Sequence, residues 1–139
     1  LDLPATMEYL ETQGVPVIGY ATDEFPAFYS RKSGVSVPIR IDSPDEIAGL
    51  YHAQRKLGLE QGILVANPID ADAEIPADVV RSYIEIALGE CTERGISGRE
   101  VTPFLLSRVT ELSSGTTLEA NISLYNNNID LACEIARRL

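Results

Sequence analysis

The chain has 139 residues, 45% of them hydrophobic, which is enough for one globular domain with a hydrophobic core. Its 21 acidic residues outnumber 11 basic ones and give a formal net charge of −10. This surplus argues against nucleic acid and anionic membrane surfaces as partners, because both require a basic footprint.

The start of the chain and its two cysteines indicate the kind of protein and the cellular compartment to which it belongs. The chain starts at Leu1 without a methionine and shows no signal-peptide pattern, so we expect a further segment to precede it. Cys91 and Cys133 lie far apart, and neither has metal-ligand spacing. They are predicted to be reduced core thiols of a cytoplasmic protein. No apolar run is long enough to span a bilayer.

The first part of the chain predicts a helix followed by two short strands. Residues 4–13 have helical character, and Gly14 suits the end of a helix. The apolar runs 15–20 and 38–41 predict strands. Between them, residues 21–31 are aromatic, charged and aperiodic, which indicates an ordered loop.

A second helix is predicted to begin at Ser43, because Pro44 suits the first helical position and Glu46 would complete a capping box. Its expected inward stripe is Ile47, Leu50, Tyr51 and Leu57. Residues 62–68 then form a continuous apolar run bounded by turn residues. Such a run is typical of a central parallel strand.

Three helices are predicted in the remainder of the chain. Residues 76–94 carry the clearest helical period, with the inward set Val79, Val80, Tyr83, Ile84, Ala87, Leu88 and Cys91. Thr102 opens the next helix, whose expected inward residues are Leu105, Leu106, Val109 and Leu112. Thr116 and Glu119 predict a capping box for the last one.

Strands that alternate with helices predict an α/β fold with three layers, α/β/α. Helix outweighs strand heavily, and a sheet of so few strands is thin for so many amphipathic helices. We therefore expect further strands from an N-terminal segment outside this chain.

The common catalytic sets are missing from the sequence. His52 is the single histidine, which removes Ser-His-Asp, Cys-His and histidine-based zinc sites. Lys32 lies in a polar loop and Lys56 near a helix end, and neither has the apolar surroundings expected of an imine-forming lysine. No glycine-rich phosphate loop is present.

Carboxylates are the next candidates. Asp23 and Glu24 follow a predicted strand, where sites often lie, but they could equally be ordinary loop charges or groups that support a site. Asp42 is expected to interact with the N-terminus of the following helix.

Asparagines are the unusual feature of the last helix. Asn121 is followed by the run Asn126, Asn127 and Asn128, although asparagine is a poor helix former. A side-chain amide offers an acceptor and donors together, which complements the N–H and carbonyl of a pyrimidine edge. A solvated face with hydrogen bonds between helices is an equally good interpretation of these residues alone.

An ordered set of segments resembles one known family. The segments are 19–29, 42–43, 65–69, 101–106, 118–122 and 127–128, with sequences such as Thr22-Asp23-Glu24-Phe25-Pro26 and Leu118-Glu119-Ala120-Asn121. They resemble the pseudouridine-5′-phosphate glycosidases, also called indigoidine-synthase-A-like proteins, along the whole chain. No single motif is decisive, but the set in this order is specific.

The resemblance implies a homotrimer with the α/β/α fold that reversibly cleaves pseudouridine 5′-phosphate to uracil and ribose 5-phosphate, with Mn²⁺ bound. The bond that breaks joins two carbons, so no heteroatom leaving group can be protonated as in ordinary glycosidases. The family uses a lysine that forms an imine with the opened ribose. The resemblance makes residues 1–139 the C-terminal part of a single domain of this family, so that lysine, the general-acid glutamate and the metal-binding aspartate are expected upstream of this chain.

One functional position carries over directly: Asn121 matches the asparagine that binds uracil. Asn67, Thr102, Asn127 and Asn128 match motif positions without a defined role and are further candidates for substrate binding. The segment alone is expected to be inactive without its N-terminal partner. Two alternatives stay open, a C-riboside synthase of a biosynthetic pathway and a folded fragment without activity.

Overall fold

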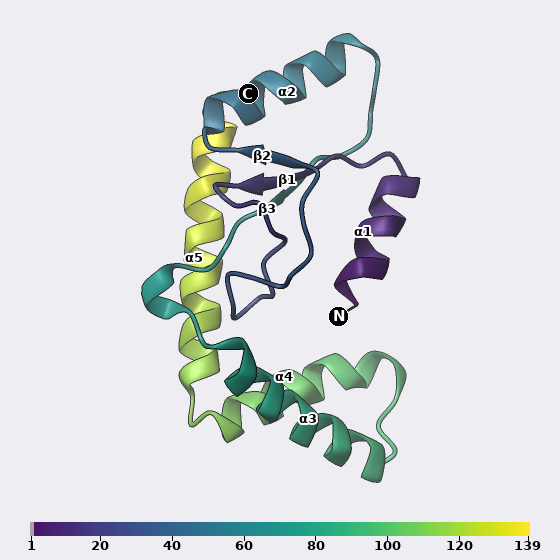
Figure 1. Ribbon diagram of the computed structural model, residues 1–139, viewed down its shortest axis with the longest axis vertical. Coiled ribbons are helices and arrows are strands. Elements are labelled where there is room, and N and C mark those ends of the chain that lie inside the picture. Colours follow the sequence, from purple (N-terminus) through teal and green to yellow (C-terminus); the bar gives the residue numbers. More distant parts are fainter. Residues whose placement is uncertain (1) are drawn as a thin grey trace.

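A small parallel sheet forms the middle of the computed structural model, which describes residues 2–139 (Figure 1). Strand β1 (Val17–Tyr20) lies between β2 (Ile39–Ile41) and β3 (Leu64–Ala66), and both pairings are parallel. Ile18 is fully buried and pairs with Ile39 on one side and Val65 on the other. Within residues 2–139, β1 is the central strand and β3, which was expected to be central, pairs only with β1.

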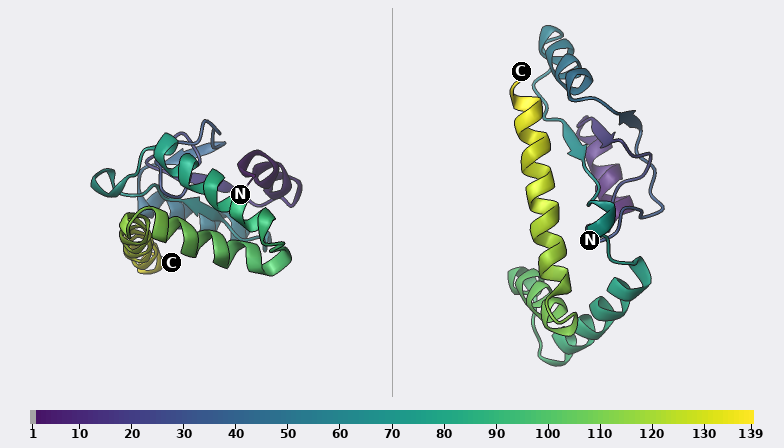
Figure 2. Two further views of the ribbon diagram at one scale, coloured as in Figure 1. Left: turned by 90° about the horizontal axis from the view of Figure 1, so that it is seen from below. Right: turned by 90° about the vertical axis from the view of Figure 1, so that its left-hand side faces the viewer.

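Residues 2–139 form five helices: α1 (Leu3–Thr12), α2 (Pro44–Lys56), α3 (Ala77–Glu93), α4 (Val101–Leu112) and α5 (Thr116–Ala136). Helices α3 and α4 pack against each other and lie below the sheet in Figure 1. Two short 3₁₀ turns, η1 (Ala71–Ala73) and η2 (Gly98–Glu100), precede α3 and α4. Helices α1 and α5 lie on opposite sides of the sheet, as both views of Figure 2 show. This arrangement confirms the predicted helix-rich α/β/α fold. None of the described helices is long and apolar enough to cross a membrane.

The helix starts show which local predictions hold. The Ser43 hydroxyl accepts a 3.2 Å hydrogen bond from the backbone N–H of Asp45, so Ser43 caps α2 as expected. The capping box predicted at Thr116 is wrong, because Gly115 occupies the cap position of α5 with a φ of 92°. The Ser113 hydroxyl accepts a hydrogen bond from the Thr117 backbone N–H instead.

Helical periodicity overestimates burial in several places. Leu57 is 76% exposed because it lies just past the last turn of α2. Cys91 is buried as predicted, whereas Cys133 is exposed, so only one of the two free thiols is a core residue. Four further residues of the predicted inward sets are exposed: Val79, Ile84, Leu88 and Leu106. An apolar period identifies the face of a helix, but it does not say whether another element covers that face.

One core cluster joins the loop after β1 to the helices. It contains Tyr29, Ile69, Ile75, Val80, Ala120 and Leu124, which come from that loop, the segment after β3, α3 and α5. Helix α1, by contrast, buries none of its residues against the described chain. The core therefore holds the aromatic loop in place beside α5.

Candidate active-site groove

A groove of about 940 Å³ runs along α5 toward α3 and α4. The aromatic loop supplies residues 25–29, and β3 supplies Val65 together with the residue that follows the strand, Asn67. Most of the lining is apolar, including Leu106, Leu124, Leu131 and Ile135. Three of the predicted site residues add polar groups to it: Asn67, Thr102 and Asn128. Ligand sites commonly combine a largely apolar surface with a few convergent polar groups.

Two asparagine side chains of α5 hold the carboxyl end of β3. The Asn67 Nδ2 donates a 3.1 Å hydrogen bond to Oδ1 of Asn128. The Asn127 Nδ2 donates a 3.0 Å hydrogen bond to the carbonyl of Pro68. Ligands of α/β proteins bind beyond the carboxyl ends of parallel strands, and here that end is fixed by the helix.

Asn121 and Asn127 do not line the groove with the other three candidates. Asn127 faces the backbone of Pro68, so its visible role is structural. Asn121 is partly buried and lies seven residues before Asn128, which is about two helical turns along the same face of α5. Its neighbours Ala120 and Leu124 pack in the core cluster with Tyr29, so Asn121 lies on the helix face next to the aromatic loop.

The aromatic loop is fastened to the segment that contains η1. The Ser30 hydroxyl donates a 2.8 Å hydrogen bond to the carbonyl of Ile75, whose N–H donates a 2.9 Å bond to the carbonyl of Tyr29. The backbone N–H of Arg31 donates to the Glu74 carboxylate at 2.8 Å. These bonds join residues more than 40 positions apart, and they confirm the predicted ordered loop.

Tyr29 and Thr117 are a buried polar pair that sequence reasoning missed. Thr117 is fully buried, and its hydroxyl lies 2.9 Å from that of Ser113. Burial raises the pKa of the Tyr29 phenol, and hydrogen bonding with Thr117 offsets part of this rise. The Ser113 and Thr117 hydroxyls form a small buried network beside Tyr29. The sequence gives no signal for it, because Tyr29 lies in a loop, Ser113 follows the end of α4 and Thr117 lies in α5.

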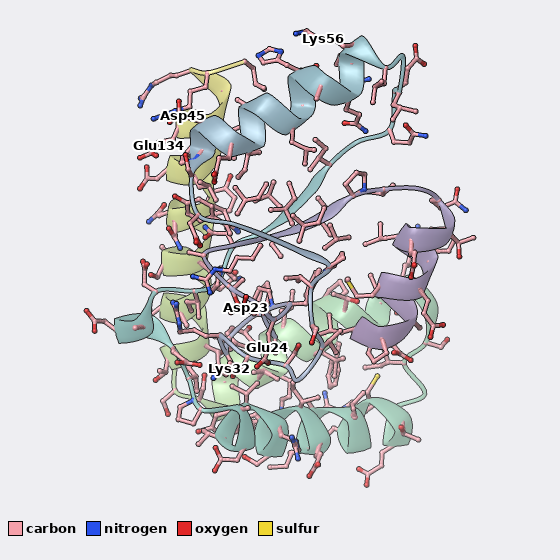
Figure 3. All side chains as sticks on the ribbon, turned by 45° about the horizontal axis from the view of Figure 1, so that its top comes forward. Asp23, Glu24, Lys32, Asp45, Lys56 and Glu134 are labelled. Carbon is pink, nitrogen blue, oxygen red and sulfur yellow. The ribbon has the colours of Figure 1, made fainter. Side chains whose placement is uncertain are left out.

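A second, smaller hollow of about 220 Å³ lies beside the loop and contains Asp23, Glu24, Lys32 and Arg40. Arg40 donates 2.8 Å bonds to both Asp23 and Asp42, and hydrogen bonding first to Asp42 and then to Asp23 raises its pKa. Glu24 accepts a 2.8 Å bond from the backbone N–H of Gly34. Figure 3 labels Asp23 and Glu24 on this loop. These carboxylates organise the loop.

Asp42 was expected to interact with the start of α2. Its side chain accepts a hydrogen bond from Arg40 instead, and Ser43 makes the capping bond. The reason is that Arg40, two residues earlier on an extended strand, projects on the same side of the chain as Asp42.

The histidine and the lysines stay outside the groove. His52, Lys32 and Lys56 are all exposed, and Figure 3 shows Lys56 on α2, away from Lys32 on the loop. Within residues 2–139, no group of three or more histidine, cysteine, aspartate or glutamate side chains could hold a metal ion. The described residues therefore do not fit a Mn²⁺ site.

A thin parallel sheet between helices, with an amide pair at the carboxyl end of a strand, defines an α/β protein with a candidate small-molecule site. Residues 1–138 match the family described as indigoidine synthase A like protein, and the chain belongs to this family. It is 55% identical over 136 residues to the pseudouridine-5′-phosphate glycosidase of Legionella pneumophila, covering 98% of this chain and 44% of that protein. The corresponding protein of Solibacter usitatus is 49% identical over 139 residues, covering 100% of this chain and 46% of its own length.

Solved structures agree with this assignment. An indigoidine synthase A-like protein from Thermotoga maritima superposes with a TM-score of 0.86 at 43% identity, covering 98% of this chain and 44% of that one. The prealnumycin C-glycosynthase, solved with ribulose 5-phosphate, gives 0.84 at 33% identity, covering 98% of this chain and 45% of that one. The chain thus spans about half the length of the curated relatives it matches.

Proposed function

We propose that the full-length protein carrying this segment reversibly cleaves pseudouridine 5′-phosphate to uracil and ribose 5-phosphate. The observation that carries this proposal is the identity of 49% to 55% with proteins named pseudouridine-5′-phosphate glycosidase, sustained over at least 98% of the chain. The groove supports it as well, because side-chain amides line an otherwise apolar site.

This segment supplies the side of the site that binds the base. Asn121, on the face of α5 beside the aromatic loop and outside the groove lining, is proposed to pair with the N–H and carbonyl of uracil. Asn67, Asn128 and Thr102 supply polar groups of the adjoining groove. The imine-forming lysine, the glutamate and the Mn²⁺ ligand are proposed to come from upstream residues. The exposure of Lys32 and Lys56 supports this division, since an imine-forming lysine works best in desolvated surroundings.

The direct test is uracil release by the full-length protein from pseudouridine 5′-phosphate, followed by chromatography. Uridine 5′-phosphate, which carries the same base through nitrogen, is the control substrate. The proposal predicts release from the C-riboside and none from the N-riboside. The reverse pattern would place the protein among ordinary nucleosidases.

The segment alone is proposed to be inactive. Mixing it with the upstream segment, expressed separately, should restore uracil release if the two halves form one site. The exposed apolar residues of α1, including the 65% exposed Tyr9, support such a union because they lack a covering element in residues 2–139.

A C-riboside synthase is the second candidate, and the structural likeness to the prealnumycin C-glycosynthase favours it. The two candidates can be distinguished by measuring which acceptor compounds the full-length protein joins to ribose 5-phosphate. A glycosidase should join ribose 5-phosphate to uracil best, whereas a synthase of the second kind should prefer a larger aromatic acceptor.

The protein is also proposed to be a cytoplasmic homotrimer. The outer face of α5 supports association, because four exposed apolar residues recur there at spacings of four, three and four: Leu118, Ile122, Tyr125 and Ile129. Light scattering should give the mass of three chains for the full-length protein, and Ile122→Lys should shift it to smaller species. A monomeric wild-type protein would refute the trimer.

The free thiols of Cys91 and Cys133 fit the reducing cytoplasm.

A further inference from the structure

Phe28 has an unusual backbone conformation at the edge of the groove. Its φ is 65°, in the left-handed region that bulky L-residues rarely occupy. This conformation costs about 1–2 kcal/mol relative to the right-handed one. It persists because the flanking chain is fixed: the Ala27 N–H bonds to the Ser30 carbonyl at 2.8 Å, and Ser30 is bonded to Ile75. Strain that the surroundings maintain in this way is concentrated at functional positions.

The conformation brings an aromatic ring to the groove. Phe28 lines the groove with Asn67 and Asn128, yet it remains 45% exposed. The ring of Tyr29 meets that of Phe28 edge-on, at a centroid distance of 4.7 Å and an interplanar angle of 83°. Tyr29 is itself fixed in the core cluster with Ala120 and Leu124. Within residues 2–139, Phe28 is thus an aromatic ring that Tyr29 contacts, that is partly exposed and that lines the groove.

The adjoining helix face carries the amides. Ala120 and Leu124 flank Asn121 in the sequence and pack against Tyr29, the neighbour of Phe28. Leu124 also lines the groove together with Phe28. The same region therefore offers an aromatic ring and side-chain amides, which recognise the flat surface and the polar edge of a heterocyclic base, respectively.

We infer that Phe28 is a specificity-determining residue whose ring contacts the face of the planar base. The inference rests on the proposed function and adds a criterion to it: the amides select the hydrogen-bonding edge, and Phe28 selects an aromatic, flat ring. The strained left-handed backbone at position 28 is retained because it places that ring at the groove.

Dihydrouracil is the probe that isolates this contact. It has the same N–H and carbonyl edge as uracil, but its ring is saturated at two carbons and puckered. Binding of each compound to the full-length protein, measured by competition with product formation, gives a ratio of affinities. Wild-type protein should prefer uracil, and Phe28→Leu should lower this preference at least about fivefold, as expected when a base loses one aromatic stacking partner. Phe28→Tyr should keep it.

A second variant separates recognition from folding. Phe28→Gly removes the ring and relieves the left-handed strain, so it should stay folded and lose the preference as Phe28→Leu does. An unchanged uracil to dihydrouracil ratio in either folded variant would overturn the inference. A wild-type protein that binds no uracil and releases none from pseudouridine 5′-phosphate would overturn the proposed function instead. Ribose 5-phosphate affinity should stay the same in all variants.

Discussion

The side-chain amide of Asn67 donates a 3.1 Å hydrogen bond to the side-chain carbonyl of Asn128, which joins the end of β3 to the middle of α5. Asn127 adds a bond to the carbonyl of Pro68, one residue further along. The asparagine run that is unfavourable for an isolated helix is thus explained in part by the strand end that it holds. The position of the polar part of the groove depends on this contact between helix and strand.

Loss of the Asn127 contact should lower stability. Asn127→Ala leaves the Pro68 carbonyl without its partner, whereas Asn126→Ala removes an exposed amide that forms no hydrogen bond with residues 2–139. Both changes gain the same helix propensity, so their difference isolates the hydrogen bond. Asn127→Ala should be less stable than Asn126→Ala by about 0.5–1.5 kcal/mol in urea unfolding. Equal stabilities would show that the bond contributes nothing.

The central strand should not tolerate a methyl group at Gly19. A Cβ there would collide with the carbonyl oxygen of Thr22 and approach the Val37 side chain within 2.7 Å. Gly19→Ala should therefore destabilise the protein by about 1–3 kcal/mol, as overpacking does. Gly49→Ala is the matched control, because it lies in α2 with open space around it and should stabilise by up to about 1 kcal/mol. Thermal unfolding of the two variants should shift in opposite directions.

The contact between α3 and α4 should depend on pH. Arg108 donates bonds of 2.8 to 3.0 Å to both oxygens of Glu90, and this hydrogen bonding lowers the pKa of Glu90. A lowered folded-state pKa means that the stabilisation is present above the ordinary value of about 4.3 and is lost as pH falls through the folded pKa. Wild-type protein should lose more of its urea midpoint between about pH 6 and pH 3 than Glu90→Gln does. Parallel curves for the two proteins would indicate that the pair has no pH-dependent effect.

Asn121→Ala should weaken base binding more than sugar binding. Removing one buried pairing costs on the order of 1–3 kcal/mol, so the affinity for uracil should fall about 5- to 150-fold. Ribose 5-phosphate affinity should change little, and Asn126→Ala should alter neither. Competition assays on the full-length protein provide both values. Unchanged uracil affinity would remove Asn121 from the site.

Much of the fold follows from local sequence rules. Periodicity and turn residues locate all five helices and the three strands to within a few residues, because helix starts such as Ser43-Pro44 have a direct physical cause. The order of the strands in the sheet is not predictable in this way. Residues 62–68 are apolar enough for a central strand, yet pairing is a tertiary property that a single segment does not determine.

The candidate site was predictable only in part. The sequence predicts Asn67, Thr102 and Asn128, and all three line the same groove, although 61 positions separate Asn67 from Asn128. Phe28 and Tyr29 were seen as part of an aromatic loop, but nothing local shows that Phe28 takes a positive φ. That conformation arises from hydrogen bonds to residues near 75, which only the fold brings close.

Borohydride trapping of the full-length protein with ribose 5-phosphate tests most directly the claim that this segment binds the base while the covalent chemistry comes from elsewhere. Reduction should fix the sugar phosphate to one lysine, and peptide mass spectrometry identifies which one. The account predicts an adduct on a lysine outside residues 1–139, with Lys32 and Lys56 unmodified. An adduct on Lys32 or Lys56, or no adduct in a protein that releases uracil, would contradict it.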